Sequence, residues 1–282
     1  MPEGDTVWLT ARTLHQGLAG QLLTACDFRV PQLATADLTG RTVREVVARG
    51  KHLLLRVTGT DADPMPGGLT LHTHLRMDGA WHLYRTGQPW RGGPAHEVRV
   101  VLETARWTAL GYRLPVVEVL ATRDEHRAVG HLGPDLLGPD WNPAEAVRRL
   151  AAQPDRPLGV ALLDQRTLAG LGNLYRCELC FLRGVTPWTP VGQAGDLAAL
   201  VELAHRLLHR NRDTAAQVTT GDTRHGRRVW VYGRGGQACL RCGTRIAVDE
   251  QAPSNRPNEA RLTFWCPHCQ RGPAPVSATT RR

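Results

Sequence analysis

The sequence predicts an α+β protein with its strands in the first half and its helices in the second. Seven short runs of β-branched and apolar residues, separated by Gly, Pro and Asp, lie between residues 22 and 120. Apolar residues then recur every three to four positions up to residue 211, which is typical of helices. Two Cys-x-x-Cys pairs follow. Strands followed by helices favour an α+β fold, here an N-terminal β-sandwich or flattened barrel flanked by helices.

The first element is an amphipathic helix over about residues 4–18, with Val7, Leu14 and Leu18 on one face. Asp5 and Thr6 are its candidate cap residues. The chain start therefore lies near the positive end of a helix dipole, which disfavours a proton on an amine there.

The predicted strands come next, and the Gly- and Pro-rich segments 58–67 and 85–94 between them are expected to be loops. The strand runs cover residues 22–30, 42–48, 52–57, 68–75, 79–84, 97–102 and 114–120. Their short, regular spacing is the reason for expecting a sandwich.

The second half begins with a turn-rich connector, because Gly-Pro-Asp occurs twice within residues 122–142. Between the second and third expected helices, Gly170-Leu-Gly-Asn173 predicts a tight turn with open backbone amides. The expected helices cover residues 143–152, 158–164, 174–182 and 196–211. The predicted domains are residues 1–121, the connector 122–142, residues 143–229 and residues 230–272, with a disordered tail at 273–282.

Four of the seven cysteines predict a structural zinc site. Two Cys-x-x-Cys knuckles are separated by 23 residues, slightly more than in the usual zinc-ribbon spacing, and they comprise Cys239, Cys242, Cys266 and Cys269. Two knuckles complete a closed tetrahedral site with no open position for a substrate. Disulfides are the alternative, and an intracellular location argues against them.

The other three cysteines and a pair of histidines give weaker evidence for metal binding. Cys177 and Cys180 lie in an apolar helical run and are expected to be core residues, and Cys26 is expected to be a core or strand residue. His72 and His74 form a possible metal pair without a third ligand nearby in sequence.

The composition favours a polyanionic partner. The net charge is +9 over 282 residues, and of the 35 basic residues only Lys51 is lysine. A lysine retained in so arginine-rich a chain suggests a position that needs a compact charge able to exchange a proton. No run approaches the ~20 apolar residues of a membrane span, and the start lacks a signal-peptide layout, so we expect a cytoplasmic protein without a membrane partner.

The chain start carries a possible nucleophile. Removal of Met1 would expose the secondary amine of Pro2 beside the Glu3 carboxylate. An α-amino group titrates at about 7.7–8.0, so part of it is unprotonated near neutral pH and can form a Schiff base. Most chains that begin in this way simply have a frayed end.

The motifs together resemble the formamidopyrimidine-DNA glycosylase/endonuclease VIII family, and the resemblance spans nearly the whole chain. The start looks most like the actinobacterial endonuclease VIII branch. The motifs are Met-Pro-Glu-Gly at 1–4, Arg-Gly-Lys-His at 49–52, His-Leu-Arg-Met-Asp-Gly at 74–79, His-Leu-Gly-Pro-Asp-Leu at 131–136, Leu-Ala-Gly-Leu-Gly-Asn-Leu-Tyr at 168–175, Val-Tyr-Gly-Arg at 231–234 and Arg-Leu-Thr-Phe-Trp-Cys at 261–266.

The resemblance implies a bifunctional DNA glycosylase/AP lyase of base excision repair that flips a damaged base out of double-stranded DNA. Its C-terminal part would be a helix–two-turn–helix domain with a zinc-ribbon β-hairpin. Pro2 would attack C1′ of the sugar, and Glu3 would transfer protons at the ring-opening sugar. Lys51 would act as a cation or acid between the phosphate and the sugar, and β,δ-elimination would cut the strand.

The resemblance also implies the DNA contacts. His74, Asn173 and Arg261 would bind the phosphates that flank the lesion, Arg261 from the tip of the ribbon hairpin. Met77 would fill the gap left by the flipped base. We expect a monomer associated with the nucleoid, with single-stranded or bubble DNA as possible further substrates.

The sequence departs from the family pattern at two places, which bear on the catalytic carboxylates and on the expected substrate. Asp5-Thr6 replaces a Pro-Glu pair, so a supporting carboxylate is missing. Residues 107–115 lack the Arg-Arg-Phe-Gly wedge of the formamidopyrimidine branch, which leaves Tyr112 as a wedge candidate and favours oxidised pyrimidines over 8-oxoguanine. The alternatives are a non-catalytic damage-binding zinc-ribbon protein and a lyase in which Lys51 forms the Schiff base.

Overall fold

The computed structural model describes residues 2–59 and 67–275. The chain divides into two compact units, Met1–His131 and Leu132–Arg282, and each is considered separately. None of the helices in the described ranges has the length and apolar character needed to cross a membrane.

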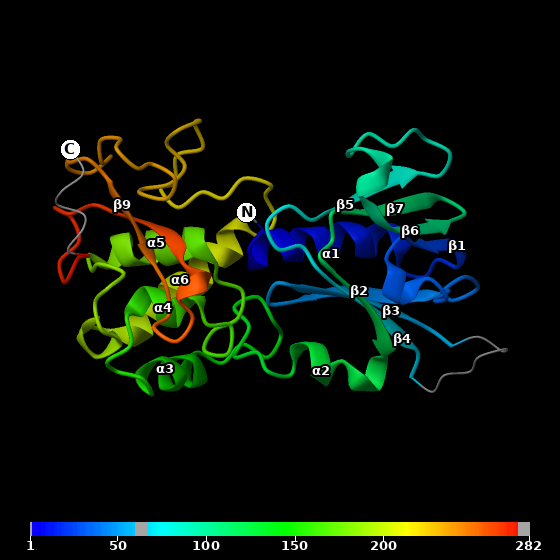
Figure 1. The fold of residues 1–282 in the computed structure, drawn as a ribbon, viewed down its shortest axis with the longest axis horizontal. Helices are drawn as coiled ribbons and strands as arrows, with labels where there is room; N and C mark the ends of the chain where they lie inside the picture. The colour runs from blue at the N-terminus through cyan, green and yellow to red at the C-terminus, as the bar shows by residue number, and fades with distance from the viewer. Residues whose placement is uncertain (1, 60–66, 276–282) are drawn as a thin grey trace. The chain divides into compact units, whose positions relative to one another are not determined.

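The first unit is a β-sandwich of two four-stranded antiparallel sheets, with orders β1-β6-β7-β5 and β2-β3-β4-β8 (Figure 1). Its strands are β1 Leu23–Phe28, β2 Val43–Arg49, β3 His52–Val57, β4 Leu69–His74, β5 Ala80–Arg85, β6 Val98–Thr104, β7 Trp107–Tyr112 and β8 Val116–Ala121. Its helices are α1 Gly4–Leu18 and α2 His126–Val129, with 3-10 turns at η1 Pro31–Leu33, η2 Ala95–Glu97 and η3 Thr122–Asp124.

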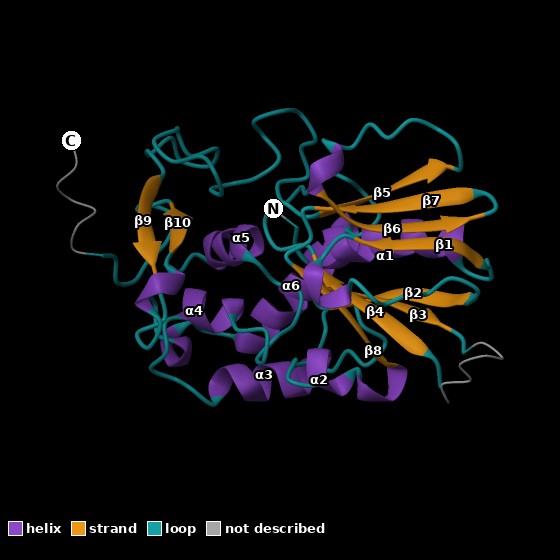
Figure 2. Cartoon of the chain, turned by 45° about the vertical axis from the view of Figure 1, so that its right-hand side comes forward, coloured by secondary structure: helices purple, strands orange, loops and turns teal. Residues whose placement is uncertain are grey.

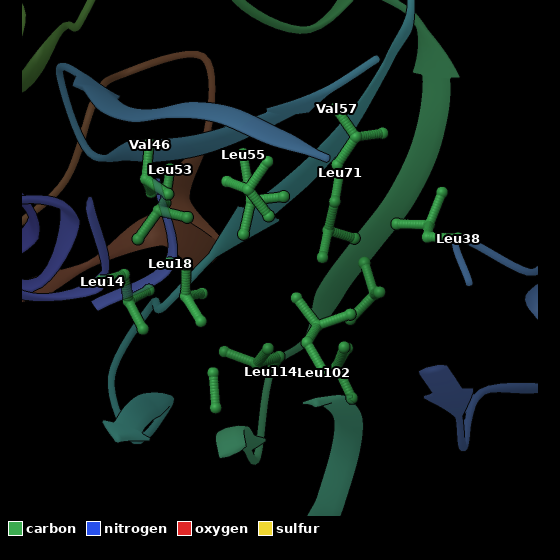
Figure 3. Close-up of a cluster of buried hydrophobic side chains, with 14 of the residues drawn as sticks. Leu14, Leu18, Leu38, Val46, Leu53, Leu55, Val57, Leu71, Leu102 and Leu114 are labelled. Carbon is green, nitrogen blue, oxygen red and sulfur yellow. The ribbon is translucent and has the colours of Figure 1, made fainter. Parts of the chain in front are cut away.

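A single apolar core joins the two sheets and α1. Leu14 and Leu18 of α1 pack against side chains from β2, β3 and β4 of one sheet and from β6 of the other (Figure 3). Gly17 allows close approach, because a Cβ there would lie 2.5 Å from Leu83 of β5. Burial of these side chains holds α1 against both sheets.

The structure corrects two expectations in this unit. An eighth strand, β7, lies between β5 and β6 where no strand was predicted. Gly111 weakened the strand pattern, and it is required because a Cβ there would lie 2.4 Å from Leu114. The N-cap of α1 is Glu3, so Asp5 and Thr6 lie inside the first turn and do not cap the helix.

The second unit contains helices and one two-stranded ribbon, as predicted (Figure 2). Asn142 and Asp196 cap the first and last of its helices by accepting hydrogen bonds from backbone amides. The elements are α3 Pro143–Ala151, α4 Leu158–Leu163, α5 Asn173–Arg183, α6 Leu197–Asn211, β9 Ala247–Gln251 and β10 Arg261–Trp265, with 3-10 turns at η4 Val191–Gln193 and η5 Pro257–Glu259.

The ribbon shares a core with helix α5. Cys177 and Phe181 of α5 pack with Ile246 and with two of the knuckle cysteines, Cys239 and Cys266. Together with full burial of Cys180, this confirms that Cys177 and Cys180 are core residues. Burial also raises the pKa of both thiols, which keeps them protonated.

Some sequence predictions stay untested. The boundary between the compact units falls inside the 122–142 connector, but the finer division at residues 143, 230 and 273 remains a prediction. The loop predicted at 58–67 and the tail predicted at 273–282 lie largely outside the described residues.

Candidate active site

The start of α1 and the turn that carries Lys51 lie at the same end of the first unit. Gly20 donates to the Val43 carbonyl over 2.8 Å, and Val46 donates to the His15 ring over 3.1 Å, so α1 runs antiparallel to β2. From His15 back to the helix start at Gly4 is about 16 Å at 1.5 Å per residue. From Val46 on to the β2–β3 turn is about 16 Å at 3.3 Å per residue. The two ends are therefore level, and Figure 1 shows α1 alongside β2.

The remaining residues predicted in this unit gather at that end as well. His74 ends β4 directly opposite His52, the residue after Lys51. Met77 follows in the β4–β5 turn and is 50% exposed. The turn is tight, since Arg76 adopts a positive φ of 48° and its amide donates to the His74 ring over 2.9 Å.

Pro2 and Glu3 have different surroundings. Glu3 is fully buried and its carbonyl accepts the first helical bond, from Val7, while Pro2 is half-buried. The positive end of α1 is therefore beside the Pro2 nitrogen, and it would disfavour a proton on the amine that removal of Met1 exposes.

Three histidine rings surround that of His52, the residue after Lys51. The His52 ring lies 5.1 Å from the His72 ring, 4.8 Å from that of His74 and 6.0 Å from that of His131. Burial is the main cause that lowers the pKa of His52 to about 3 and that of His74 to about 4, and the Lys51 charge adds to both shifts. Both rings are therefore neutral near pH 7.

The wedge expectation for Tyr112 is wrong. Its side chain is completely buried in β7, among Val98, Val101 and Leu110. A buried ring cannot enter DNA, and the pattern of residues 107–115 was misread because β7 was not recognised. The same unit buries Asp5, whose carboxylate accepts from the Thr6 amide over 2.8 Å.

In the second unit, the structure brings Asn173 and the Arg261 strand together. The Asn173 side-chain amide donates to the Leu262 carbonyl over 2.8 Å, next to Arg261 in the chain. Arg261 itself is exposed and opens β10, where it pairs with Gln251 at the loop end of the hairpin. Asn173 is the first residue of α5, so it lies at the positive end of the helix dipole, which favours an anion.

A buried arginine connects these elements. Arg176 is fully buried and donates to the Asn173 side chain over 2.5 Å, to Thr263 over 2.6 Å and to Gln251 over 3.0 Å. Among the described residues, all of its hydrogen-bond partners are uncharged. The guanidinium thus fixes the Asn173 amide against both strands of the ribbon.

The four knuckle cysteines form the metal-ligand cluster identified among the described residues. Their sulfurs all lie within 4.8 Å of one another, with 4.0 Å between Cys239 and Cys269 and 3.5 Å between Cys242 and Cys266. A tetrahedron of thiolates around zinc has edges of about 3.8 Å, given a Zn–S distance of about 2.3 Å. The residues fit such an ion, and Cys266 stands at the opposite end of β10 from Arg261.

Sequence reasoning missed the supporting residues. His52 and His72 were seen only as part of a motif and a possible metal pair, while Glu118, Arg176 and Gln251 were not singled out. Their roles depend on contacts between strands or between a helix and the ribbon. The available clue was a polar residue in an apolar run, as for His72 in β4 and Arg176 in α5.

The solved structures with similar coordinates identify the class of fold. The chain superposes on a MutM protein in complex with DNA that contains carbocyclic 8-oxo-G, with a TM-score of 0.75, 22% identity, and 96% of this chain and 100% of that chain covered. The Lactococcus lactis formamidopyrimidine-DNA glycosylase non-covalently bound to DNA with an AP site gives a TM-score of 0.74 at 22% identity, with the same coverage. At this identity the likeness shows the fold alone.

The sequence comparisons establish the family. A family profile for the formamidopyrimidine-DNA glycosylase N-terminal domain matches residues 1–115. A Streptomyces coelicolor protein named "Probable endonuclease 8 2" is 58% identical over 277 residues, covering 98% of this chain and 96% of that protein. The Mycolicibacterium smegmatis "DNA-(apurinic or apyrimidinic site) lyase Nei2" is 50% identical, covering 96% and 99%. The chain belongs to the formamidopyrimidine-DNA glycosylase/endonuclease VIII family, and the predicted resemblance is confirmed.

Proposed function

We propose that this protein is a bifunctional DNA glycosylase/AP lyase of base excision repair. The observation that carries the proposal is that the start of α1 and the turn with Lys51 lie at the same end of the first unit. It provides an amine, a buried carboxylate and a lysine for chemistry at one sugar. Family membership and relatives named endonuclease 8 and AP lyase support the same activity.

In this mechanism the Pro2 nitrogen, exposed by removal of Met1, attacks C1′ and the damaged base leaves. The secondary amine yields an iminium, which acidifies C2′ so that β- and then δ-elimination break the strand. Glu3 protonates the opening sugar, and its burial suits a carboxyl group that must hold a proton. Lys51 supplies a positive charge between the flanking phosphate and the sugar.

The proposed DNA contacts come from both units. His74 in the first unit, and Asn173 and Arg261 in the second, bind backbone phosphates, while exposed Met77 enters the duplex. We assign one structural zinc ion to Cys239, Cys242, Cys266 and Cys269. When bound, it would hold the ribbon, and with it Arg261, in place.

The proposed substrates are oxidised pyrimidines in double-stranded DNA, because the wedge motif of the formamidopyrimidine branch is absent from residues 107–115. A cytoplasmic, nucleoid-associated monomer remains our expectation for its state in the cell.

Borohydride trapping tests the proposal. Incubation with duplex DNA that contains an abasic site should give a covalent complex, and peptide mapping should place the adduct on residue 2. An adduct on Lys51 would show that Lys51, and not Pro2, is the nucleophile. The absence of any adduct would favour a non-catalytic damage-binding protein. A Glu3→Gln variant should lose base release, whereas unchanged cleavage would point to a contaminating activity.

The preferred lesion is tested with a panel of thymine glycol, 5-hydroxyuracil and 8-oxoguanine duplexes, with an abasic duplex as the reference. Faster release of 8-oxoguanine than of the oxidised pyrimidines would contradict the proposed substrate class.

A further inference from the structure

A chain of hydrogen bonds runs across one sheet of the first unit and ends next to Lys51. Glu118 of β8 accepts from or shares a proton with the Nδ1 atom of His72 over 2.9 Å. The Nε2 atom of His72 lies 2.8 Å from the Nδ1 atom of His52. Glu118 is directly opposite His72 in the strand ladder, and His52 follows Lys51 in the chain.

The chain lies on the outer face of the sheet, away from the sandwich core. Leu53 and Leu71, which alternate with these histidines in β3 and β4, belong to the core. His72 is nevertheless only 3% exposed, while the Glu118 side chain is 58% exposed. The three groups therefore connect solvent with the surroundings of Lys51 through a buried ring.

The carboxylate at one end determines where the protons lie. A carboxylate oxygen only accepts, so His72 donates from Nδ1. If His72 is neutral, its Nε2 atom accepts, and His52 donates from its own Nδ1 atom. The Nε2 atom of His52 then carries a lone pair, and it makes no hydrogen bond among the described residues. The inner end of the chain is thus a proton acceptor.

We propose that His52, His72 and Glu118 form a proton relay that accepts the proton released during strand cleavage. The inference rests on the proposed lyase function. It gives His52 and His72 positioning and proton-transfer roles outside the expected set of Pro2, Glu3 and Lys51.

The proton comes from C2′ of the iminium. The C2′–H bond of the iminium breaks, its electrons form the C2′–C3′ double bond, and the C3′–O bond breaks as the phosphate leaves. The proton binds the Nε2 atom of His52, directly or through a water, while the Nδ1 proton of His52 passes to the Nε2 atom of His72. His72 becomes an imidazolium beside the Glu118 carboxylate, which passes the proton to solvent.

The surrounding charges explain why the proton has to move on. Burial is the main cause that disfavours a charge on His52, and the neighbouring His74, His72, His131 and Lys51 add to the effect. Glu118 faces His72, and Glu125, which is bound to Arg56 and Thr70, also interacts electrostatically with it. A proton that reaches His72 therefore lies beside the Glu118 carboxylate, whereas the pKa of His52 is lowered to about 3.

Single-turnover kinetics of Glu118→Gln test the relay. The amide keeps an oxygen that accepts from His72 but loses the charge that stabilises the imidazolium. Strand cleavage of abasic DNA should slow by about tenfold, and the acid limb of its pH profile should move down by about one unit. The yield of borohydride-trapped adduct should not change, because iminium formation precedes the step.

The matched control is Glu45→Gln. Glu45 lies on β2 of the same sheet and binds Arg56 instead of a histidine. It should leave both trapping and cleavage unchanged. Unchanged cleavage in Glu118→Gln, or an equal loss of trapping and cleavage, would overturn the relay.

A second measurement does not depend on activity. In ¹⁵N NMR spectra at neutral pH, His52 and His72 should both be neutral Nδ1–H tautomers. An Nε2–H tautomer at His52 would overturn the relay even in an active enzyme. Conversely, a wild-type protein that forms no adduct but shows both tautomers would refute the proposed lyase function and leave the hydrogen-bond chain intact.

Discussion

The two units of this protein use positive charge in different ways. Around Lys51 the first unit places histidines whose pKa values are lowered to about 3 and 4, so those rings carry no charge near neutral pH. At the hairpin tip the second unit uses Arg261 and, beneath it, the buried Arg176. Arginine stays protonated under all working conditions, whereas lysine and histidine exchange protons. The first unit thus offers groups that can exchange protons around Lys51, whereas the arginines of the second unit keep a fixed charge.

The largest expected effect is that of metal removal, which should disrupt the second unit and not the first. A chelator, or Cys266→Ser, should unfold the ribbon and abolish DNA binding, because structural zinc contributes on the order of 10 kcal/mol or more to the folding of such small sites. Metal content per chain and a binding titration check this. Cys180→Ser, a buried cysteine outside the cluster, is the control and should keep its zinc.

Acid should destabilise the first unit through its neutral histidines. His52 and His74 have folded pKa values of about 3 and 4, below the unfolded value of about 6.5. Between pH 6.5 and 4 the unfolded chain binds more protons, so stability is complete above 6.5 and falls with pH. Each histidine contributes at most about 1.4 kcal/mol per pH unit.

Urea unfolding of wild type and His74→Gln across that range measures the effect. The variant should show a shallower loss of stability on acidification, whereas exposed His96→Gln should follow the wild type. Equal slopes for all three proteins would show that His74 is not neutral in the folded state.

Arg261→Ala should weaken binding to damaged and undamaged duplexes by a similar factor. Loss of one phosphate contact costs about 1–2 kcal/mol and reduces the slope of log K against log salt by about one. Arg245→Ala, in the ribbon but bound to the Gly236 carbonyl, is the control. A changed lesion preference at unchanged affinity would contradict the phosphate-binding role.

The smallest expected effect comes from Tyr112→Phe. The Tyr112 hydroxyl is buried without a hydrogen-bond partner among the described residues. Its removal should therefore stabilise the first unit by up to about 1 kcal/mol in thermal unfolding and leave lesion release unchanged. A loss of lesion discrimination would restore the wedge interpretation that the buried position contradicts.

Local pattern was enough for most elements. The run of alternating and apolar residues at 52–57 predicted β3 with the bounds that the structure has, and Gly170 to Gly172 placed the start of α5 beside Asn173. β7 was missed because its glycine is explained only by contact with Leu114. The roles of Asp5 and Tyr112 were misjudged because burial depends on which strands and helices become neighbours.

The sequence by itself determined the fold class, the family and the cysteine cluster, because spacing along the chain encodes strand and helix periods and the two knuckles. Only the tertiary structure decided which groups share protons and charges. The bonds from Glu118 through His72 to His52 cross three strands, and those of Arg176 join a helix to the ribbon across some 75 or more positions in the chain. Such contacts leave no periodic pattern, since they arise from the pairing of distant segments.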